Sequence, residues 1–188
     1  MSEILYKKDL HVGDNVTQVL TVKPWLGNNR FDIREWQSGY PTKKGVSLPT
    51  LRWVALAFAT DLVDQAIKDV TGQKDVDFEY HLGKNVYVSV KSPYRLVDIR
   101  QRFVDAEGVL RPTKRGLKLK LQTWTSLKAA IQEIKEAVPE TSVILPCFLD
   151  DDHQNQQGYI NCPECNPNGY NTGFDAAIGY NTGYDTVQ

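Results

Sequence analysis

The sequence predicts an α+β fold in which a strand-strand-strand-strand-helix module occurs twice in tandem. Short signatures recur in the same order along the chain, which indicates an internal repeat. Alternating β-branched residues come first in each copy, and an amphipathic stretch of helical period follows. The 188 residues leave room for two such small modules.

Two signatures define the repeat. Residues 31–34, Phe-Asp-Ile-Arg, match residues 97–100, Val-Asp-Ile-Arg, at a spacing of 66. Residues 41–48 match residues 112–119 at a spacing of 71. The second copy therefore has five extra residues within 103–111, and we expect them in a hairpin loop.

The strands are clearest in the second copy. Residues 86–90 alternate as a first strand, Ser92-Pro93-Tyr94 ends it, and residues 96–100 form a second strand. Residues 105–108 are typical of a turn, and residues 109–111 begin a short third strand. Pro112 and Gly116 separate it from a fourth strand at residues 117–119.

Each copy ends in a predicted helix with one apolar face. In the second copy this face carries Trp124, Leu127, Ile131, Ile134 and Val138, and the helix ends near Pro139. In the first copy it carries Trp53, Leu56, Thr60, Val63 and Ile67. A module of about 60 residues is marginal alone, so we expect an intrachain pseudo-two-fold dimer with the helices packed together. The predicted boundaries are 1–76, 77–139 and 140–188.

Charge is distributed unevenly along the chain. Residues 78–138 carry twelve Lys and Arg against six Asp and Glu, a net charge of +6, whereas residues 1–77 carry ten of each. Residues 139–188 carry seven acidic and no basic residues. A basic module favours an anionic partner, although a solvated face with a solubilising tail fits the same composition. No apolar run is long enough for a membrane span.

The sequence offers no catalytic set. His11, His81 and His153 lie in unrelated contexts, and no nucleophile-elbow, zinc-protease or phosphate-loop motif occurs. Basic residues and aromatic residues near the strands instead suit single-stranded nucleic acid, which needs phosphate contacts and stacking platforms. Each has a structural alternative: Arg34 and Arg100 could pair with nearby acids, and Tyr94 and Phe103 could be core.

These residues resemble the positive cofactor four family of RNA polymerase II transcription coactivators. The resemblance rests on residues 82–91, 97–100, 105–108, 111–117 and 124–128, and the first copy matches more weakly. It implies a four-stranded antiparallel sheet followed by a helix, used as a dimer that holds single-stranded or melted DNA across its sheets. The resemblance transfers the family's nucleic-acid contacts in the second copy to Lys84, Lys91, Tyr94, Arg100, Phe103, Arg111, Lys114 and Arg115. In the first copy it implies Trp25, Arg34, Lys43 and Lys44.

The first copy departs from the pattern at Gln37, where the second copy has an aromatic residue, and it has no net charge. It could bind weakly or serve mainly as the pairing partner. We therefore expect a non-enzymatic, nuclear, single-stranded DNA-binding protein that acts in transcription, replication or repair, with transcription machinery and activators as further partners. The alternatives are a protein-interaction adaptor, an RNA-binding module and a tail that recruits partners.

The tail differs from the modules in composition. The heptad Gly169-Tyr170-Asn171-Thr172-Gly173-Phe174-Asp175 recurs at residues 179–185, and such composition favours a segment without a packed core. Cys147, His153, Cys162 and Cys165 are four candidate zinc ligands within 19 residues. Their spacing fits no common zinc finger, so a flexible tail with free thiols is the alternative and no cofactor is required.

Overall fold

The structure, a computed structural model, describes residues 3–153 and 156–169. The first module contains β1 (Tyr6–Val12), β2 (Val16–Trp25), β3 (Asn28–Gln37) and β4 (Tyr40–Pro49), followed by α1 (Thr50–Phe58) and α2 (Thr60–Thr71). The second contains β5 (Asp77–Gly83), β6 (Val86–Lys91), β7 (Leu96–Val104) and β8 (Leu110–Lys120), followed by α3 (Leu121–Ala137). Short helices follow: η1 (Pro139–Ser142), η2 (Cys147–Leu149), η3 (Asp151–His153) and α4 (Gln156–Asn161).

The strands form two four-stranded antiparallel sheets. Their orders are β1-β2-β3-β4 and β5-β6-β7-β8, so every strand pairs with its neighbour in the chain. The two sheets contact each other through β4 and β8. The predicted α+β class, with an antiparallel sheet and a helical segment in each module, is confirmed.

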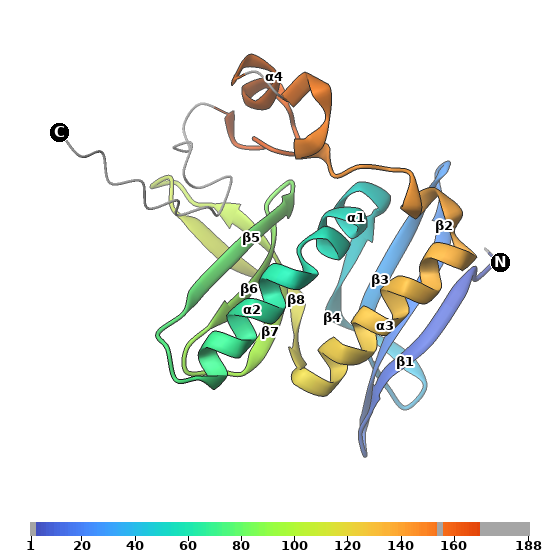
Figure 1. The fold of residues 1–188 in the computed structure, drawn as a ribbon. Helices are drawn as coiled ribbons and strands as arrows, with labels where there is room; N and C mark the ends of the chain where they lie inside the picture. The colour runs from blue at the N-terminus through green and yellow to red at the C-terminus, as the bar shows by residue number, and fades with distance from the viewer. Residues whose placement is uncertain (1–2, 154–155, 170–188) are drawn as a thin grey trace.

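The helices cross between the modules. α3 packs along β1 of the first sheet, whereas α1 contacts β5 and α2 contacts β6 of the second sheet. Figure 1 shows α2 and α3 lying across the same side of the two sheets. α1 also contacts β3 and β4 of its own sheet, and α3 also contacts β7 and β8, so each sheet packs against helices of both modules around one continuous core.

Both helix tryptophans are in the core, as predicted. Trp53 stacks on Phe31 with ring centroids 4.7 Å apart. Trp124 is buried, and its indole nitrogen donates a 2.8 Å hydrogen bond to Asp64 on α2. Lys128 also pairs with Asp64, so one carboxylate links the helices of both modules.

The strand assignment from sequence was wrong in two places. The first strand of the second module is β5, which was not predicted although Phe78, Tyr80 and Leu82 alternate with polar residues along it. The residues assigned to a third and a fourth strand belong to one strand, β8, in which Pro112 and Gly116 are internal. The longer hairpin lies where it was predicted, with residues 105–109 in place of Ser38 and Gly39, but this loop holds only three of the five extra residues and the flanking strands hold the other two.

The helical segment of the first module is broken, whereas one continuous helix was predicted. α1 ends at Phe58, and α2 begins at Thr60 with Ala59 between them. The Thr60 hydroxyl donates to the Ala57 carbonyl at 2.9 Å, which occupies a carbonyl near the break.

Residues 139–153 and 156–169 form short helices and turns that contact the body, with Phe148 against Phe58 and Tyr80. The repeated Gly-Tyr-Asn-Thr heptads extend beyond Gly169 and lie outside the described residues. Within the described ranges, no helix has the length and apolar character needed to cross a membrane.

Candidate nucleic-acid interface

Strand alternation separates a core face from an outer face in the second sheet. Val86, Val88 and Val90 of β6 join the hydrophobic core. Tyr87 and Ser89 therefore point to the other side, which the helices leave uncovered. The helices thus occupy one side of the sheet and leave its other side to form a site.

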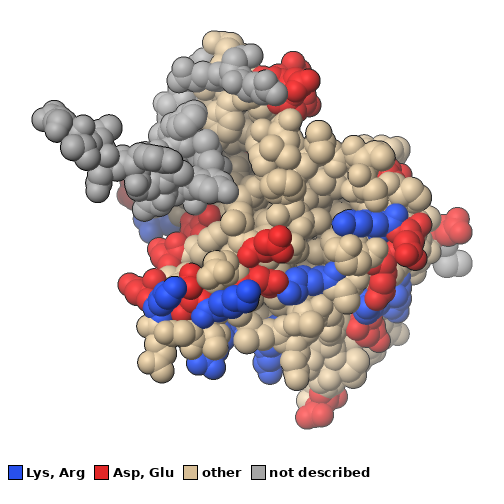
Figure 2. All heavy atoms as spheres, in the orientation of Figure 1, with Lys and Arg blue, Asp and Glu red and all other residues tan. Residues whose placement is uncertain are grey.

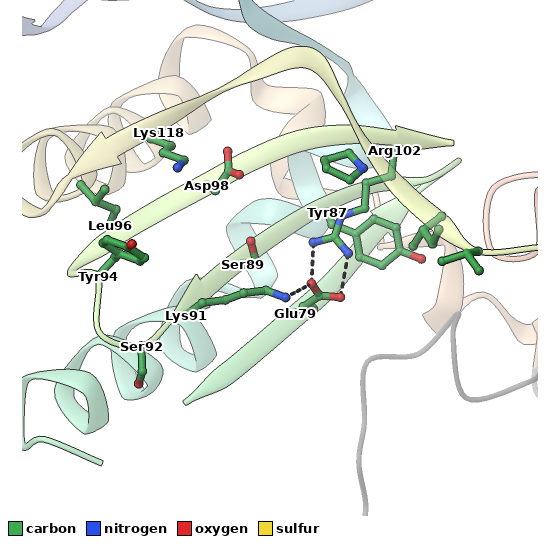
Figure 3. Close-up of a pocket in the computed structure, with 13 residues that line it drawn as sticks. Glu79, Tyr87, Ser89, Lys91, Ser92, Tyr94, Leu96, Asp98, Arg102 and Lys118 are labelled. Carbon is green, nitrogen blue, oxygen red and sulfur yellow. Dashed lines mark hydrogen bonds and ion pairs between the residues drawn. The ribbon is translucent and has the colours of Figure 1, made fainter. Parts of the chain in front are cut away.

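A groove of about 760 Å³ lies on this outer face. All four strands contribute to it, and Figure 3 shows Lys91, Tyr94 and Lys118 around its floor of Ser89 and Asp98. Its lining comprises Glu79, Tyr87, Ser89, Lys91, Ser92, Tyr94, Leu96, Asp98, Arg102, Val109, Leu110, Pro112 and Lys118.

The charges at one side of the groove form a network centred on Glu79. Its carboxylate accepts hydrogen bonds from Arg102 at 2.6 and 2.7 Å and lies 2.7 Å from the Lys91 ammonium (Figure 3). Burial raises the pKa of Glu79, but the hydrogen bonds from Arg102 and Lys91 outweigh it, so the pKa lies below its ordinary value. Burial lowers the pKa of Lys91, and its bonds to Asp77 and Glu79 reverse the shift.

Tyr87 closes the end of the groove near this network. Its ring lies between His81, stacked at 4.8 Å, and the Arg102 guanidinium, 4.6 Å from the ring centroid. The residue is only 4% exposed, and burial raises its pKa to about 12. Tyr87 is therefore part of the groove wall rather than a free stacking platform.

The first sheet carries a smaller groove at the equivalent place. This groove of about 500 Å³ is lined by Thr21, Lys23, Pro24, Trp25, Arg30, Asp32 and Ser47. Thr21 pairs with Asp32 across β2 and β3, as Ser89 pairs with Asp98 across β6 and β7. The two grooves are thus related by the internal repeat.

The two predicted aromatic residues of the first connections line these grooves. Tyr94 is 66% exposed beside the second groove, and Trp25 is 59% exposed beside the first. Phe103 is 48% exposed but does not line the groove, because alternation along β7 turns it away from Arg102. None of the three is a core residue.

A bulge lies at the same position in both sheets. Arg100 pairs with Gly116 while Arg102 pairs with Pro112, so residues 113–115 of β8 face Gln101 alone. Residues 42–44 of β4 likewise face Glu35 alone. Each bulge therefore carries one of the predicted basic pairs, Lys43 with Lys44 or Lys114 with Arg115.

An arginine holds each bulge in place. Arg100 donates to both Asp98 oxygens and to the Thr113 carbonyl, the latter at 2.8 Å. Arg34 makes the same contacts with Asp32 and the Thr42 carbonyl, and its hydrogen bond to Asp32 raises its pKa. Since a guanidinium has five N–H donors, donors remain on each arginine for another partner.

The predicted basic residues divide into paired and unpaired groups. Lys91 pairs with Asp77 and Glu79, Arg111 with Asp105 and Glu107, and Lys44 with Glu35. Lys43, Lys84, Lys114 and Arg115 are exposed and have no ion pair with any residue of the ranges 3–153 and 156–169. Among the predicted basic residues, these four are the most available to an external anion.

Several residues of the outer faces were not predicted from the sequence. Lys118 lies between buried Leu117 and Leu119, so strand alternation alone could have predicted it. Arg102 follows the same alternation after Asp98 and Arg100. Lys23 and Arg30 line the first groove, and no motif had marked them.

The helix side of the molecule has a different surface. Figure 2 shows basic and acidic side chains interleaved there, over the region where Figure 1 places α2 and α3. Lys8, for example, pairs with Glu133, and Lys128 with Asp64. The unpaired cations of the bulges belong instead to β4 and β8.

Two repeat-related sheets, each with a groove, a basic bulge and an exposed aromatic residue, define a tandem sheet protein with one candidate interface in each module. The family model described as Transcriptional Coactivator p15 (PC4) matches residues 15–58 and 81–130, one segment in each sheet module. The chain therefore belongs to the PC4 family and contains two copies of its domain.

Proposed function

We propose that the chain binds single-stranded or melted DNA across the outer faces of both sheets, without catalysing a reaction. The observation that carries this proposal is the repeated combination of a basic bulge and an exposed aromatic residue beside a groove. The unpaired cations would contact phosphates, and the aromatic rings would stack on bases that a duplex keeps stacked internally. Membership of the PC4 family supports the same conclusion.

The contributions of individual residues follow from their environments. Lys84, Lys114, Arg115 and Lys43 would act as phosphate contacts, with Lys91, Arg111 and Lys44 exchanging acidic partners for phosphate. Arg34 and Arg100 would mainly hold the bulges and offer their remaining donors. Tyr94 and Trp25 would stack on bases, whereas Phe103, which alternation turns away from the groove, has no contact assigned to it on the outer face.

The description of the family as a transcriptional coactivator supports a role in transcription, and hence in the nucleus. Melted promoter DNA presents the unpaired strands that the two sheets would hold. We propose modules bounded at residues 1–76 and 77–139, of which the second binds more strongly because it carries the net positive charge.

The test compares single-stranded and duplex oligonucleotides by filter binding over a salt series. We expect the single strand to be preferred, and the double substitution Lys114→Glu/Arg115→Glu to weaken its binding strongly. Each phosphate contact with a single strand contributes about 0.7 to the slope of the logarithm of the binding constant against the logarithm of the salt concentration. Losing two contacts should therefore reduce the magnitude of this slope by about 1.4.

The matched control is the double substitution Lys68→Glu/Lys135→Glu on α2 and α3, which reverses two exposed lysines on the helix side. Equal weakening by this control, or equal affinity for duplex, would contradict the proposed surface. Competition with RNA of the same sequence distinguishes a DNA-binding from an RNA-binding module. If the chain binds neither DNA nor RNA, the result would favour the alternative of a protein-interaction adaptor.

A further inference from the structure

Three cysteines and one histidine meet on the segment that follows α3. Cys147 begins η2, His153 ends η3, and Cys162 and Cys165 follow α4. One ligand atom from each residue lies within 4.8 Å of every other. The sequence spacing had not matched a common zinc finger, yet the turns bring all four side chains together.

The separations suit a tetrahedral metal site. The Sγ atoms of Cys147 and Cys162 are 3.4 Å apart, and Cys147 Sγ lies 3.6 Å from His153 Nε2. Ligands about 2.3 Å (sulfur) and 2.0–2.1 Å (nitrogen) from Zn(II) are separated by about 3.5–3.8 Å in a tetrahedron. The three cysteines are free, and a separation of 3.4 Å far exceeds a disulfide bond of about 2.05 Å.

The donor set identifies the class of metal. Three thiolates and one imidazole form a soft set that favours zinc over magnesium or calcium. Four protein ligands complete a tetrahedron and leave no open position for water or substrate, as in structural zinc sites. The backbone N–H of Cys165 also points at Cys162 Sγ, 3.4 Å away, and such donors stabilise a metal-bound thiolate.

We propose that Cys147, His153, Cys162 and Cys165 bind one Zn(II) ion in a closed structural site. The ion fixes the Cys162-Pro163-Glu164-Cys165 turn and thereby positions Glu164. This residue contacts both modules, so the site fastens the segment after α3 to the two-module body.

The contacts of Glu164 explain that role. Its carboxylate accepts two hydrogen bonds from Arg52 of α1, each 2.9 Å long. Its carbonyl accepts a 2.7 Å hydrogen bond from the backbone nitrogen of Lys84, in the β5–β6 turn. A Cβ on Gly83 would lie 2.5 Å from Glu164 Oε2, so the turn and the carboxylate fit together closely.

A second contact lies beside the first. Asn85 and Asn168 exchange two side-chain hydrogen bonds of 2.8 and 2.9 Å. The β5–β6 turn, which presents Lys84 to solvent, is therefore held by the segment that the metal organises. Removing the ion is expected to loosen this turn while leaving both sheets intact.

The test begins with the metal content of the purified full-length chain by mass spectrometry. We expect about one equivalent of zinc, released stoichiometrically when a mercurial reagent titrates the thiols, as for a site in which the thiolates are ligands. Replacement by Co(II) should give the visible absorption of a tetrahedral thiolate site. Both readouts use the unmodified protein, so neither depends on a variant that folds.

The variants then locate the site. Cys162→Ser and His153→Ala should each lower the bound zinc, whereas His11→Ala on β1 should leave it unchanged. Glu164→Gln should keep the zinc and lower only the thermal stability of the docked segment. The proposal is overturned if the wild-type chain holds less than about a tenth of an equivalent after growth with zinc, or if His11→Ala loses as much metal as Cys162→Ser.

Discussion

At the scale of single residues, basic side chains that look equivalent in the sequence differ in their hydrogen-bond partners and their exposure. Arg34, Arg100 and Arg115 are all basic residues of repeated signatures, yet the first two are hydrogen-bonded to aspartates whereas Arg115 is exposed. A phosphate would have to compete with Asp98 for Arg100 but not for Arg115. Charge reversal at Arg115 therefore tests binding, whereas substitution of Arg100 would also disturb the bulge.

Tyr94→Ala is expected to reduce affinity for single-stranded DNA by about 1–3 kcal/mol, the usual contribution of one stacked base. Tyr94 is exposed beside the groove, so its removal should leave the fold unchanged. Fluorescence anisotropy measures the loss, and Leu51→Ala on α1 is the control because Leu51 is also an exposed apolar residue. An equal loss in both variants would mean that Tyr94 does not stack on a base.

Gly116→Ala is expected to destabilise the protein by about 1–3 kcal/mol, the range for forcing extra atoms into a filled site. A Cβ there would lie 2.6 Å from the Ile99 carbonyl oxygen and 2.8 Å from Arg100 Cα, both backbone atoms. Chemical denaturation measures the change against Gly72→Ala, where the nearest contact is 3.4 Å. Equal unfolding midpoints would show that the strands can separate at the bulge without cost.

At the scale of elements, the period of the apolar residues predicted most of the second module. The face of α3 from Trp124 to Ile134 and the outward position of Tyr87 follow directly from periodicity. β5 was missed although Phe78, Tyr80 and Leu82 alternate with Asp77, Glu79 and His81, so the same periodicity could have predicted it. β8 was predicted as two separate strands because glycine usually indicates a loop in a sequence. Here Gly116 lies inside the strand, where the close approach of the Ile99 backbone leaves no room for a Cβ.

The outer network makes stability depend on pH. The pKa of Glu79 is lowered in the fold, so its contribution is complete above the ordinary value of 4.5. That contribution is lost as the pH falls through the folded pKa. Glu79→Gln should cost about 1 kcal/mol at neutral pH, because solvent screens part of the pairing.

Urea denaturation of Glu79→Gln and the wild type over a pH series measures this dependence. Their difference in unfolding free energy should shrink as the pH is lowered below 4.5. Glu136→Gln on α3 is the control, since Glu136 has no ion pair among the described residues. If the difference stays constant with pH, the ionised Glu79 carboxylate does not stabilise the fold through its pairs with Arg102 and Lys91.

At the scale of the whole molecule, pairing of the modules was predictable but the crossing of their helices was not. Two strongly apolar helix faces indicated that each module needs a partner. They did not indicate which sheet each helix covers, because both cores have similar composition. Polar pairs such as Trp124 with Asp64 and Tyr6 with Glu133 join the modules, and they are single contacts that leave no periodic pattern.

Because of this crossing, a fragment of residues 77–139 would lack α1 and α2, and it would keep only the contacts of α3 with β7 and β8. α1 and α2 pack on β5 and β6, so Leu82, Val88 and Val90 would lose their cover. Two such fragments could restore the arrangement by exchanging α3. We expect a concentration-dependent homodimer in sedimentation equilibrium, whereas a fragment of residues 1–139 should remain monomeric. A fragment 77–139 that sediments as a stable folded monomer would show that each module completes its own core, contrary to the interlocked helices.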